Sequence, residues 1–258
     1  MTSKTLLIHR ADGIVTITMN RPHRKNAADA VMFDELLATF REIGSDDADR
    51  VVILTGAGGD FCSGLDLSAM QDRQTHGLFA MRHVGDVATA LHRLPQPTIA
   101  KVRGSAVGAG MNMALLCDLV VASDNARFSE IFARRGMTID FGGSWVLPRR
   151  IGMHRAKELT LLADTIDAGE AARIGLVNRL VPDAELDRFV DDWAAQLAAG
   201  PPIALSQSKR LLNVAVDLTL EQAIDEEGAA QTINMATEDT VEAVTAFLEK
   251  RPAKFKGR

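Results

Sequence analysis

The chain has 258 residues and a formal net charge of −5 at pH 7, with 47% hydrophobic and 24% charged residues. These values are typical of one large globular domain, or of one domain with a small appendage. The acidic balance, the absence of tyrosine and an aromatic content of 5% disfavour a protein whose main partner is nucleic acid or an anionic membrane.

The cysteines and histidines indicate the compartment of the protein and disfavour a metal site. Cys62 and Cys117 are the only cysteines and neither belongs to a CxxC motif, which favours a reducing, cytoplasmic compartment. The first ten residues lack a signal-peptide pattern and no apolar run approaches 18 residues, so we expect no membrane span. The six histidines are scattered without an HxxxH pair, so we expect no metal site.

The first 60 residues predict a hairpin, a helix and a buried strand. Residues 5–10 and 14–19 are β-rich runs on either side of Ala11-Asp12-Gly13, which is a hairpin pattern. We expect Asn26 to cap a helix, because apolar residues recur at helical spacing after it. Residues 51–56 form a continuous apolar run, typical of a buried parallel strand.

Residues 98–104 and 118–123 are two further predicted strands, so strands alternate with helices up to about residue 130. That alternation favours an α/β architecture with crossover connections. After residue 143 the chain is mostly helical, with one short strand predicted within 176–182. We therefore expect a β/α core over residues 1–195 and a helical C-terminal region over 196–258.

The C-terminal helices are rich in small and apolar side chains, and two interpretations stay open. They pack against the chain's own core, or they are buried against another subunit. The residues concerned are Ala229, Ala230, Ile233, Met235, Ala236, Val241, Val244 and Phe247.

Two glycine-rich turns each follow a predicted strand. The first is TGAGGDFCSGLDL (55–67) and the second is GSAVGAGMNMA (104–114), which opens a predicted helix. Backbone N–H groups in such turns attract negative charge, and one N–H from each turn would make an oxyanion hole. Tight connections within an α/β fold are the alternative. Neither turn has the GxxxxGK[ST] or GxGxxG pattern, which disfavours a nucleotide site.

Several motifs together resemble the crotonase superfamily, also called the enoyl-CoA hydratase/isomerase family. They run in family order and spacing through nearly the whole chain: RPHRKNA, GAGGDFCSGLDL, VRGSAVGAGMNMALLCDLVVAS, ARFSEIFARRGMTIDFGGSWVLPRRIG and AARIGLVNRLVP. The resemblance implies an α/β fold, the crotonase (ClpP-like) spiral of ββα repeats, with C-terminal helices that build homotrimers or hexamers. It also implies an acyl-CoA substrate from lipid metabolism and no separate cofactor, because coenzyme A arrives as part of the substrate.

The resemblance also assigns the site residues. By motif position, the two oxyanion-hole N–H groups correspond to Ser63 and Ala109. Hydratases of the family use two glutamates, and here those positions hold Asn112 and Phe132. The residues expected to bind the substrate or its coenzyme A are Arg24, Lys25, Ser63, Gly64, Leu65, Asp66, Ala109, Asn112, Phe247 and Lys250.

Asp140 is the expected catalytic base. It lies in TIDFGG, where relatives that shift double bonds carry an aspartate in an IPDxGG motif; here Ile139 replaces the proline. One aspartate in an apolar pocket can remove a proton from C2 and return one to C4. A turn or helix-capping role is the alternative for Asp140. Glu130, two residues before the lost glutamate position, is a weaker candidate.

The leading hypothesis is therefore an enoyl-CoA isomerase. A hydratase that uses Asp140, with or without Glu130, is the first alternative. Thioester hydrolysis or decarboxylation on the same scaffold is another enzymatic alternative. A non-catalytic acyl-CoA-binding homologue that has lost its ancestral acids is the alternative from a different class.

Overall fold

The computed structural model describes residues 5–70 and 76–258. A six-stranded sheet has the strand order β1-β2-β3-β4-β6-β9. Only β1 and β2 are antiparallel in it, and this pair confirms the predicted hairpin. The strands are β1 (Leu6–Ala11), β2 (Ile14–Met19), β3 (Val51–Gly56), β4 (Thr98–Val102), β6 (Leu119–Ser123) and β9 (Arg179–Val181).

A second, three-stranded sheet has the order β5-β7-β8. Its strands are β5 (Ser105–Val107), β7 (Arg127–Ser129) and β8 (Thr165–Asp167). The predicted strand over 98–104 therefore ends at Val102, and the next three-residue strand joins a different sheet. The chain turns between the two sheets at Gly104, whose φ of 53° lies in the left-handed region that glycine tolerates.

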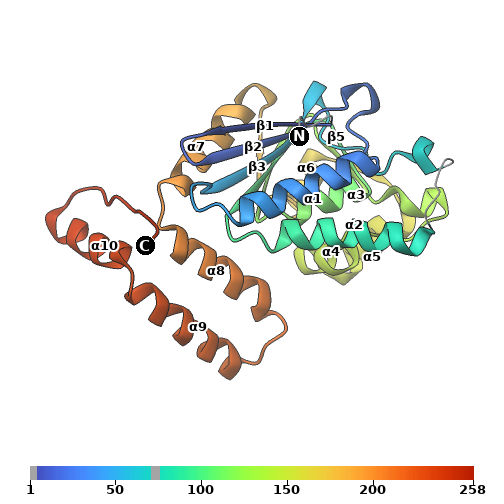
Figure 1. The fold of residues 1–258 in the computed structure, drawn as a ribbon. Helices are drawn as coiled ribbons and strands as arrows, with labels where there is room; N and C mark the ends of the chain where they lie inside the picture. The colour runs from blue at the N-terminus through green and yellow to red at the C-terminus, as the bar shows by residue number, and fades with distance from the viewer. Residues whose placement is uncertain (1–4, 71–75) are drawn as a thin grey trace.

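Helices cover both faces of the large sheet (Figure 1). One face packs against helices that include α1, α2 and α3, because Val15, Val52 and Leu54 point to that side. Alternate residues such as Val51 and Ile53 point to the other side, where they meet α7. The helices are α1 (Ala30–Gly44), α2 (Gly77–His92), α3 (Ala109–Leu116), α4 (Gly143–Ile151), α5 (Met153–Leu162), α6 (Ala168–Arg173) and α7 (Leu186–Ala198), with 3₁₀ turns η1 (Pro22–Arg24), η2 (Ala57–Gly59), η3 (Leu67–Met70), η4 (Ile131–Arg135) and η5 (Asp183–Glu185).

Asn26 does not cap the first helix, contrary to the expectation from sequence. The cap of α1 is Asp29, whose carboxylate accepts a hydrogen bond from the Met32 N–H at 2.9 Å. Asn26 is fully buried with a φ of 55°, and its amide donates to the Ala57 and Asp60 carbonyls. Asn26 thus ties the segment after β2 to the first glycine turn.

The last three helices stand apart from the sheet, at the lower left of Figure 1. They are α8 (Pro202–Ala215), α9 (Leu220–Met235) and α10 (Glu238–Glu249). The expected boundary between residues 195 and 196 falls near the end of α7, and these helices follow it. None of the described helices combines the length and apolar character needed to cross a membrane.

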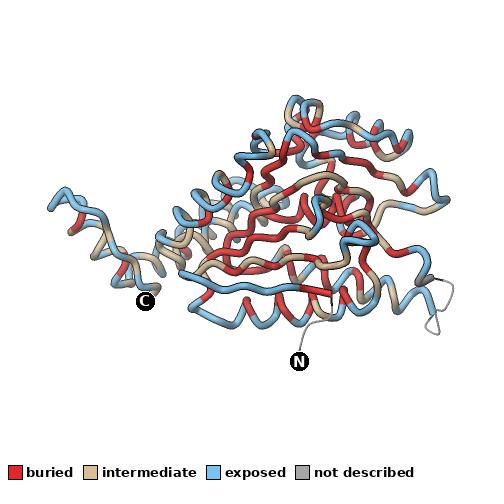
Figure 2. The backbone as a smooth tube through the Cα atoms, turned by 90° about the horizontal axis from the view of Figure 1, so that it is seen from above, coloured by how far each residue is buried: buried red, intermediate tan, exposed pale blue. Residues whose placement is uncertain are grey.

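The residues of α8–α10 are exposed or half-buried, except for Ala230, Asp239 and Ala246, and pale blue and tan therefore dominate the tube at the left of Figure 2. Of the eight small or apolar residues singled out in the sequence, only Ala230 is buried. Phe247 is 81% exposed and Leu220 is 72% exposed. Seven of these eight residues are therefore not packed against the chain's own core, whereas α8 contacts it through Lys209, whose ammonium lies 2.7 Å from the Asp118 carboxylate.

Candidate functional site

The two glycine-rich turns lie against each other. The Cys62 N–H donates to the Ser105 carbonyl, and the Val107 N–H donates to the Cys62 carbonyl, each at 2.9 Å. A Cβ at Gly110 would lie 2.2 Å from the Cys62 oxygen, so only glycine permits this approach. A Cβ at Gly64 would lie 3.6 Å from the Ala109 nitrogen. The first glycine turn therefore packs directly against the start of α3.

Leu65 and Ala109 carry free backbone donors at this meeting point. The Gly64 carbonyl accepts a hydrogen bond from the Ala28 N–H, and the Asp66 N–H donates to the Ala28 carbonyl. In this bridge the backbone N–H of Leu65 points away from Ala28. Among the described residues, the Leu65 N–H has no acceptor. The Ala109 N–H, at the start of α3, has none either, as is usual for a first helical turn.

Ser63 was expected to be one of the two donors, and this expectation is wrong. Its N–H donates to the Lys25 carbonyl at 3.0 Å, and its hydroxyl donates to the Arg24 carbonyl at 3.1 Å. A donor already bound within the chain cannot bind an oxyanion without breaking that bond. Leu65, expected only as a substrate-binding residue, replaces Ser63 as the available donor of the first turn.

Asn112 places the segment of Asp140 against α3. It is fully buried one turn into the helix, and its side-chain Nδ2 donates to the Asp140 carbonyl at 3.0 Å. The same Nδ2 lies 3.4 Å from Oε2 of Glu130. Gly143 packs directly on this amide, because a Cβ there would lie 2.3 Å from Nδ2. Asp140 and Glu130 are thus joined through one side chain of the helix that begins at Ala109.

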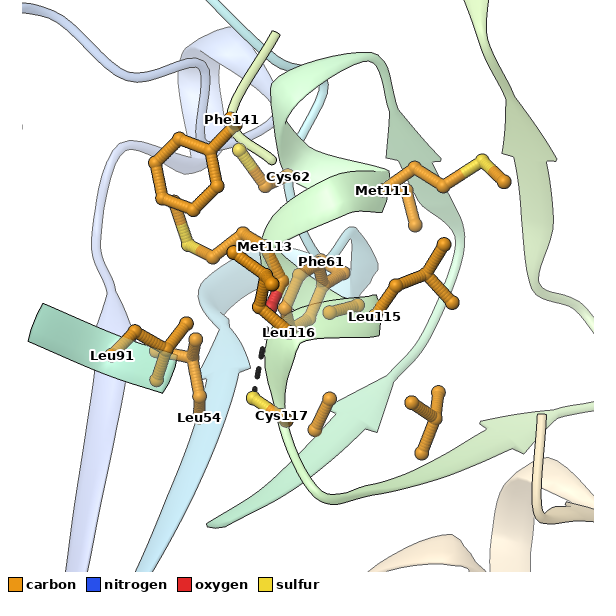
Figure 3. Packing of buried hydrophobic residues seen from close by; sticks show 14 of the residues in the cluster. Leu54, Phe61, Cys62, Leu91, Met111, Met113, Leu115, Leu116, Cys117 and Phe141 are labelled. Carbon is orange, nitrogen blue, oxygen red and sulfur yellow. Dashed lines mark hydrogen bonds between the residues drawn. The ribbon is translucent and has the colours of Figure 1, made fainter. Parts of the chain in front are cut away.

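The carboxyl group of Asp140 is mostly removed from water. Its Oδ1 is buried and has no hydrogen-bond partner within residues 5–70 and 76–258, and burial raises the pKa of Asp140 to about 6. The next residue, Phe141, has a φ of 50°, which is uncommon for a bulky side chain. The ring of Phe141 is buried in the apolar cluster around α3 that Figure 3 shows, and it stacks on Phe33 with 6.2 Å between ring centroids. This packing holds the strained turn and fixes the direction of the chain at Asp140.

Glu130 is completely buried, which sequence reasoning had not anticipated. Its Oε1 has no hydrogen-bond partner in the described part of the chain. Burial raises its pKa to about 8, and the charge of Asp140 acts in the same direction. Two carboxyl groups with separated pKa values are therefore linked to Asn112, three residues after Ala109 in α3.

Other candidates have structural partners. The Asp66 carboxylate accepts from Ser68 at 2.6 Å and from Arg21 at 2.8 Å, and the Ser68 hydrogen bond is the largest influence that lowers its pKa. Burial raises the pKa of the Cys62 thiol to about 11, so it is no nucleophile at neutral pH. The carboxylate of Asp66 is thus occupied by Ser68 and Arg21 within the turn and is not free to act as a base.

The expected coenzyme-binding residues fall into two groups. Arg24 and Lys25 are exposed and lie beside the first turn, since their carbonyls accept from Ser63. Phe247 and Lys250 lie at the end of α10, which stands away from α3 in Figure 1. Within a single chain, Phe247 and Lys250 therefore lie away from the two glycine turns. Among the described residues, no three His, Cys, Asp or Glu side chains form a group that could hold a metal ion.

Comparison with known proteins identifies the family. The sequence profile of Enoyl-CoA hydratase/isomerase matches residues 9–258. The chain is 37% identical over 262 residues to a probable enoyl-CoA hydratase from Rhodobacter capsulatus, with 100% of both chains covered. It is 35% identical over 258 residues to 1,2-epoxyphenylacetyl-CoA isomerase from Escherichia coli, with 98% of both covered.

The fold agrees with these relatives. The crystal structure of an enoyl-CoA hydratase from Bacillus anthracis superposes with a TM-score of 0.95 at 31% identity, covering 99% of this chain and 100% of that one. The α/β spiral and the helical C-terminal region expected from the sequence are thus confirmed. The chain belongs to the enoyl-CoA hydratase/isomerase family and is an enzyme of that type.

Proposed function

We propose that this enzyme shifts the double bond of an enoyl-CoA by a 1,3-proton transfer. Asp140 removes a proton from C2 of a 3-enoyl thioester, and the charge moves to the thioester oxygen. The N–H groups of Leu65 and Ala109 hold that oxygen, helped by the N-terminal end of the α3 dipole. Asp140 then returns the proton to C4, which completes the conversion to the 2-enoyl thioester. This reaction needs no further cofactor.

The observation that carries this proposal is the free, buried Oδ1 of Asp140 on a segment bound to α3. A carboxylate with a pKa of about 6 is largely ionised at pH 7 and is a stronger base than an ordinary aspartate. The relative named 1,2-epoxyphenylacetyl-CoA isomerase supports the choice of isomerisation.

Hydration of a 2-enoyl-CoA is the second candidate. The buried Glu130 beside Asp140 favours it, because addition of water needs one group that takes a proton and another that gives one. The Rhodobacter relative named a hydratase supports it too.

Incubation with matched 2-enoyl-CoA and 3-enoyl-CoA panels separates the candidates. Isomerisation leaves the mass of the substrate unchanged and moves its vinyl protons in the NMR spectrum. Hydration adds the mass of one water. We expect the 3-enoyl substrates to be converted without a mass change, and exclusive formation of the hydrated product would refute the isomerase proposal.

We further propose that the working form is a homotrimer or hexamer in the cytoplasm. The exposed apolar side chains of α8–α10 support assembly. Assembly would also give Phe247 and Lys250 a route to the coenzyme A of a neighbouring subunit. Two free, buried cysteines are consistent with a reducing compartment.

A further inference from the structure

Three buried oxygens near the site have no hydrogen-bond donor among the residues that the structure describes. They are Oδ1 of Asn112, Oε1 of Glu130 and Oδ1 of Asp140. The three residues are connected, since the Asn112 amide reaches both the Glu130 carboxyl and the Asp140 backbone. Buried polar atoms are normally paired, so three unpaired acceptors in one connected group need an explanation.

The orientation of the Asn112 amide is fixed by its neighbours. The Asp140 carbonyl can only accept, so the atom 3.0 Å from it must be the Nδ2 donor. The Oδ1 atom of Asn112 is then an acceptor as well. The group therefore holds several acceptors and a single donor, the amide NH₂ of Asn112.

The negative charge of an ionised Glu130 would be poorly stabilised at this position. Within the described residues, no lysine, arginine or histidine forms an ion pair with Glu130, and the only hydrogen bond of its carboxyl group is the 3.4 Å contact with Asn112. Its neighbour Asp140 is itself a carboxyl group whose charge disfavours a second one. A buried carboxylate without a cation or strong donors is costly, whereas the protonated acid carries no charge and adds one O–H donor to the group.

We propose that Glu130 is a positioning residue that works as a neutral carboxylic acid, holding Asn112 in place and keeping a second negative charge away from Asp140. This inference rests on the proposed function, in which negative charge develops on the thioester oxygen. If Glu130 ionised, its charge would oppose both the carboxylate of Asp140 and the developing enolate. The raised pKa of about 8 agrees with the neutral form at pH 7.

The protonation state can be observed without turnover. Protein labelled with ¹³C at the glutamate side-chain carboxyls is titrated by NMR, and the Glu130 resonance is the one missing from Glu130→Gln. We expect this resonance to keep the chemical shift of a neutral acid at pH 7 and to move only near pH 8. A resonance that titrates below pH 5, like that of an exposed glutamate, would overturn the proposal whatever reaction the enzyme catalyses.

The functional consequence is tested by the pH profile of kcat/KM. With a pKa of about 8, the neutral fraction of Glu130 at pH 9 is about one tenth, so the wild type should lose about tenfold between pH 7 and pH 9. Glu130→Gln keeps a neutral side chain and should retain activity within about threefold at pH 7, without this alkaline loss. Glu158→Gln, on an exposed position of α5, is the matched control and should keep the wild-type profile.

Two outcomes of the kinetic test would contradict the proposal. One is a Glu130→Gln enzyme with an unchanged alkaline limb. The other is a folded Glu130→Gln enzyme without activity at pH 7, which would make Glu130 a direct proton carrier. If no variant converts 3-enoyl-CoA, the isomerase proposal fails, and the NMR titration still decides the state of Glu130.

Discussion

Replacement of Asp140 by asparagine should remove the reaction while leaving the fold intact. Asparagine has nearly the same size, and the backbone carbonyl that accepts from Asn112 is unchanged. Its amide cannot take a proton, so kcat should fall by about 10²–10⁴, the usual contribution of a general base. KM should change little, because the N–H groups of Leu65 and Ala109 remain.

The same substitution should stabilise the protein at neutral pH. The pKa of about 6 in the folded chain lies about two pH units above the ordinary 3.8, so the native state binds more protons than the unfolded state between these values. Stability is therefore lost as the pH rises from about 4 to 6, by ~3 kcal/mol at most, and partial contact with solvent reduces this to about 1–2 kcal/mol. Asp140→Asn removes that loss.

Two assays measure these opposite effects. Conversion of 3-enoyl-CoA gives kcat and KM, and denaturant unfolding at pH 4 and pH 7 gives the free energy of unfolding. Wild-type kcat/KM should fall about tenfold from pH 7 to pH 5, as expected for a base with a pKa of about 6. Asp86→Asn, at an exposed position of α2, is the control and should change neither quantity. Wild-type rates in Asp140→Asn, or a less stable Asp140→Asn at pH 7, would refute the reasoning.

Three further predictions concern the backbone and the assembly. Gly143→Ala places a Cβ 2.3 Å from Asn112 Nδ2 and should lower stability by about 1–3 kcal/mol, measured by denaturant unfolding; an unchanged midpoint would contradict this contact. Ala109→Pro removes one donor at a helix position where proline is tolerated and should lower kcat by about 10²–10³ with little change in the circular dichroism spectrum, whereas unaltered kcat would remove Ala109 from the oxyanion hole. Sedimentation at micromolar concentration should show a trimer or hexamer that Leu220→Glu with Ile224→Glu dissociates, and a monomeric wild type would end that proposal.

The fold was predictable because its strands are strongly patterned. The run 51–56 is apolar throughout, and β3 is buried on both faces of the sheet. The cap at Asn26 was not predictable from local pattern, since Asn26 and Asp29 are both good helix caps. What separates them is the contact of Asn26 with Ala57 and Asp60, about thirty residues away.

The sequence predicted which two turns form the site, but not which backbone N–H group of the first turn is free. Motif position directed attention to Ser63, yet the available N–H belongs to Leu65, two residues later. The difference arises from pairing with Lys25 and Ala28, which occupies the neighbouring backbone groups. Sequence names the turn that provides a donor, whereas the hydrogen bonds of the surrounding chain decide which N–H of the turn is free.

The loss of two glutamates does not leave the site without a second acid. Asn112 stands where the resemblance places one of them, and its amide contacts the carboxyl of Glu130. Glu130 reaches this position because β7 pairs with β5 and the Gly108 N–H donates to the Ser129 carbonyl at 2.8 Å, which brings the residue after Ser129 against α3. A carboxyl group therefore lies beside the same helix from a neighbouring strand. Because the Glu130 carboxyl is fully buried and no cation among the described residues pairs with it, it is suited to hold a proton. Asp140, the base with the lower pKa, is left to take one.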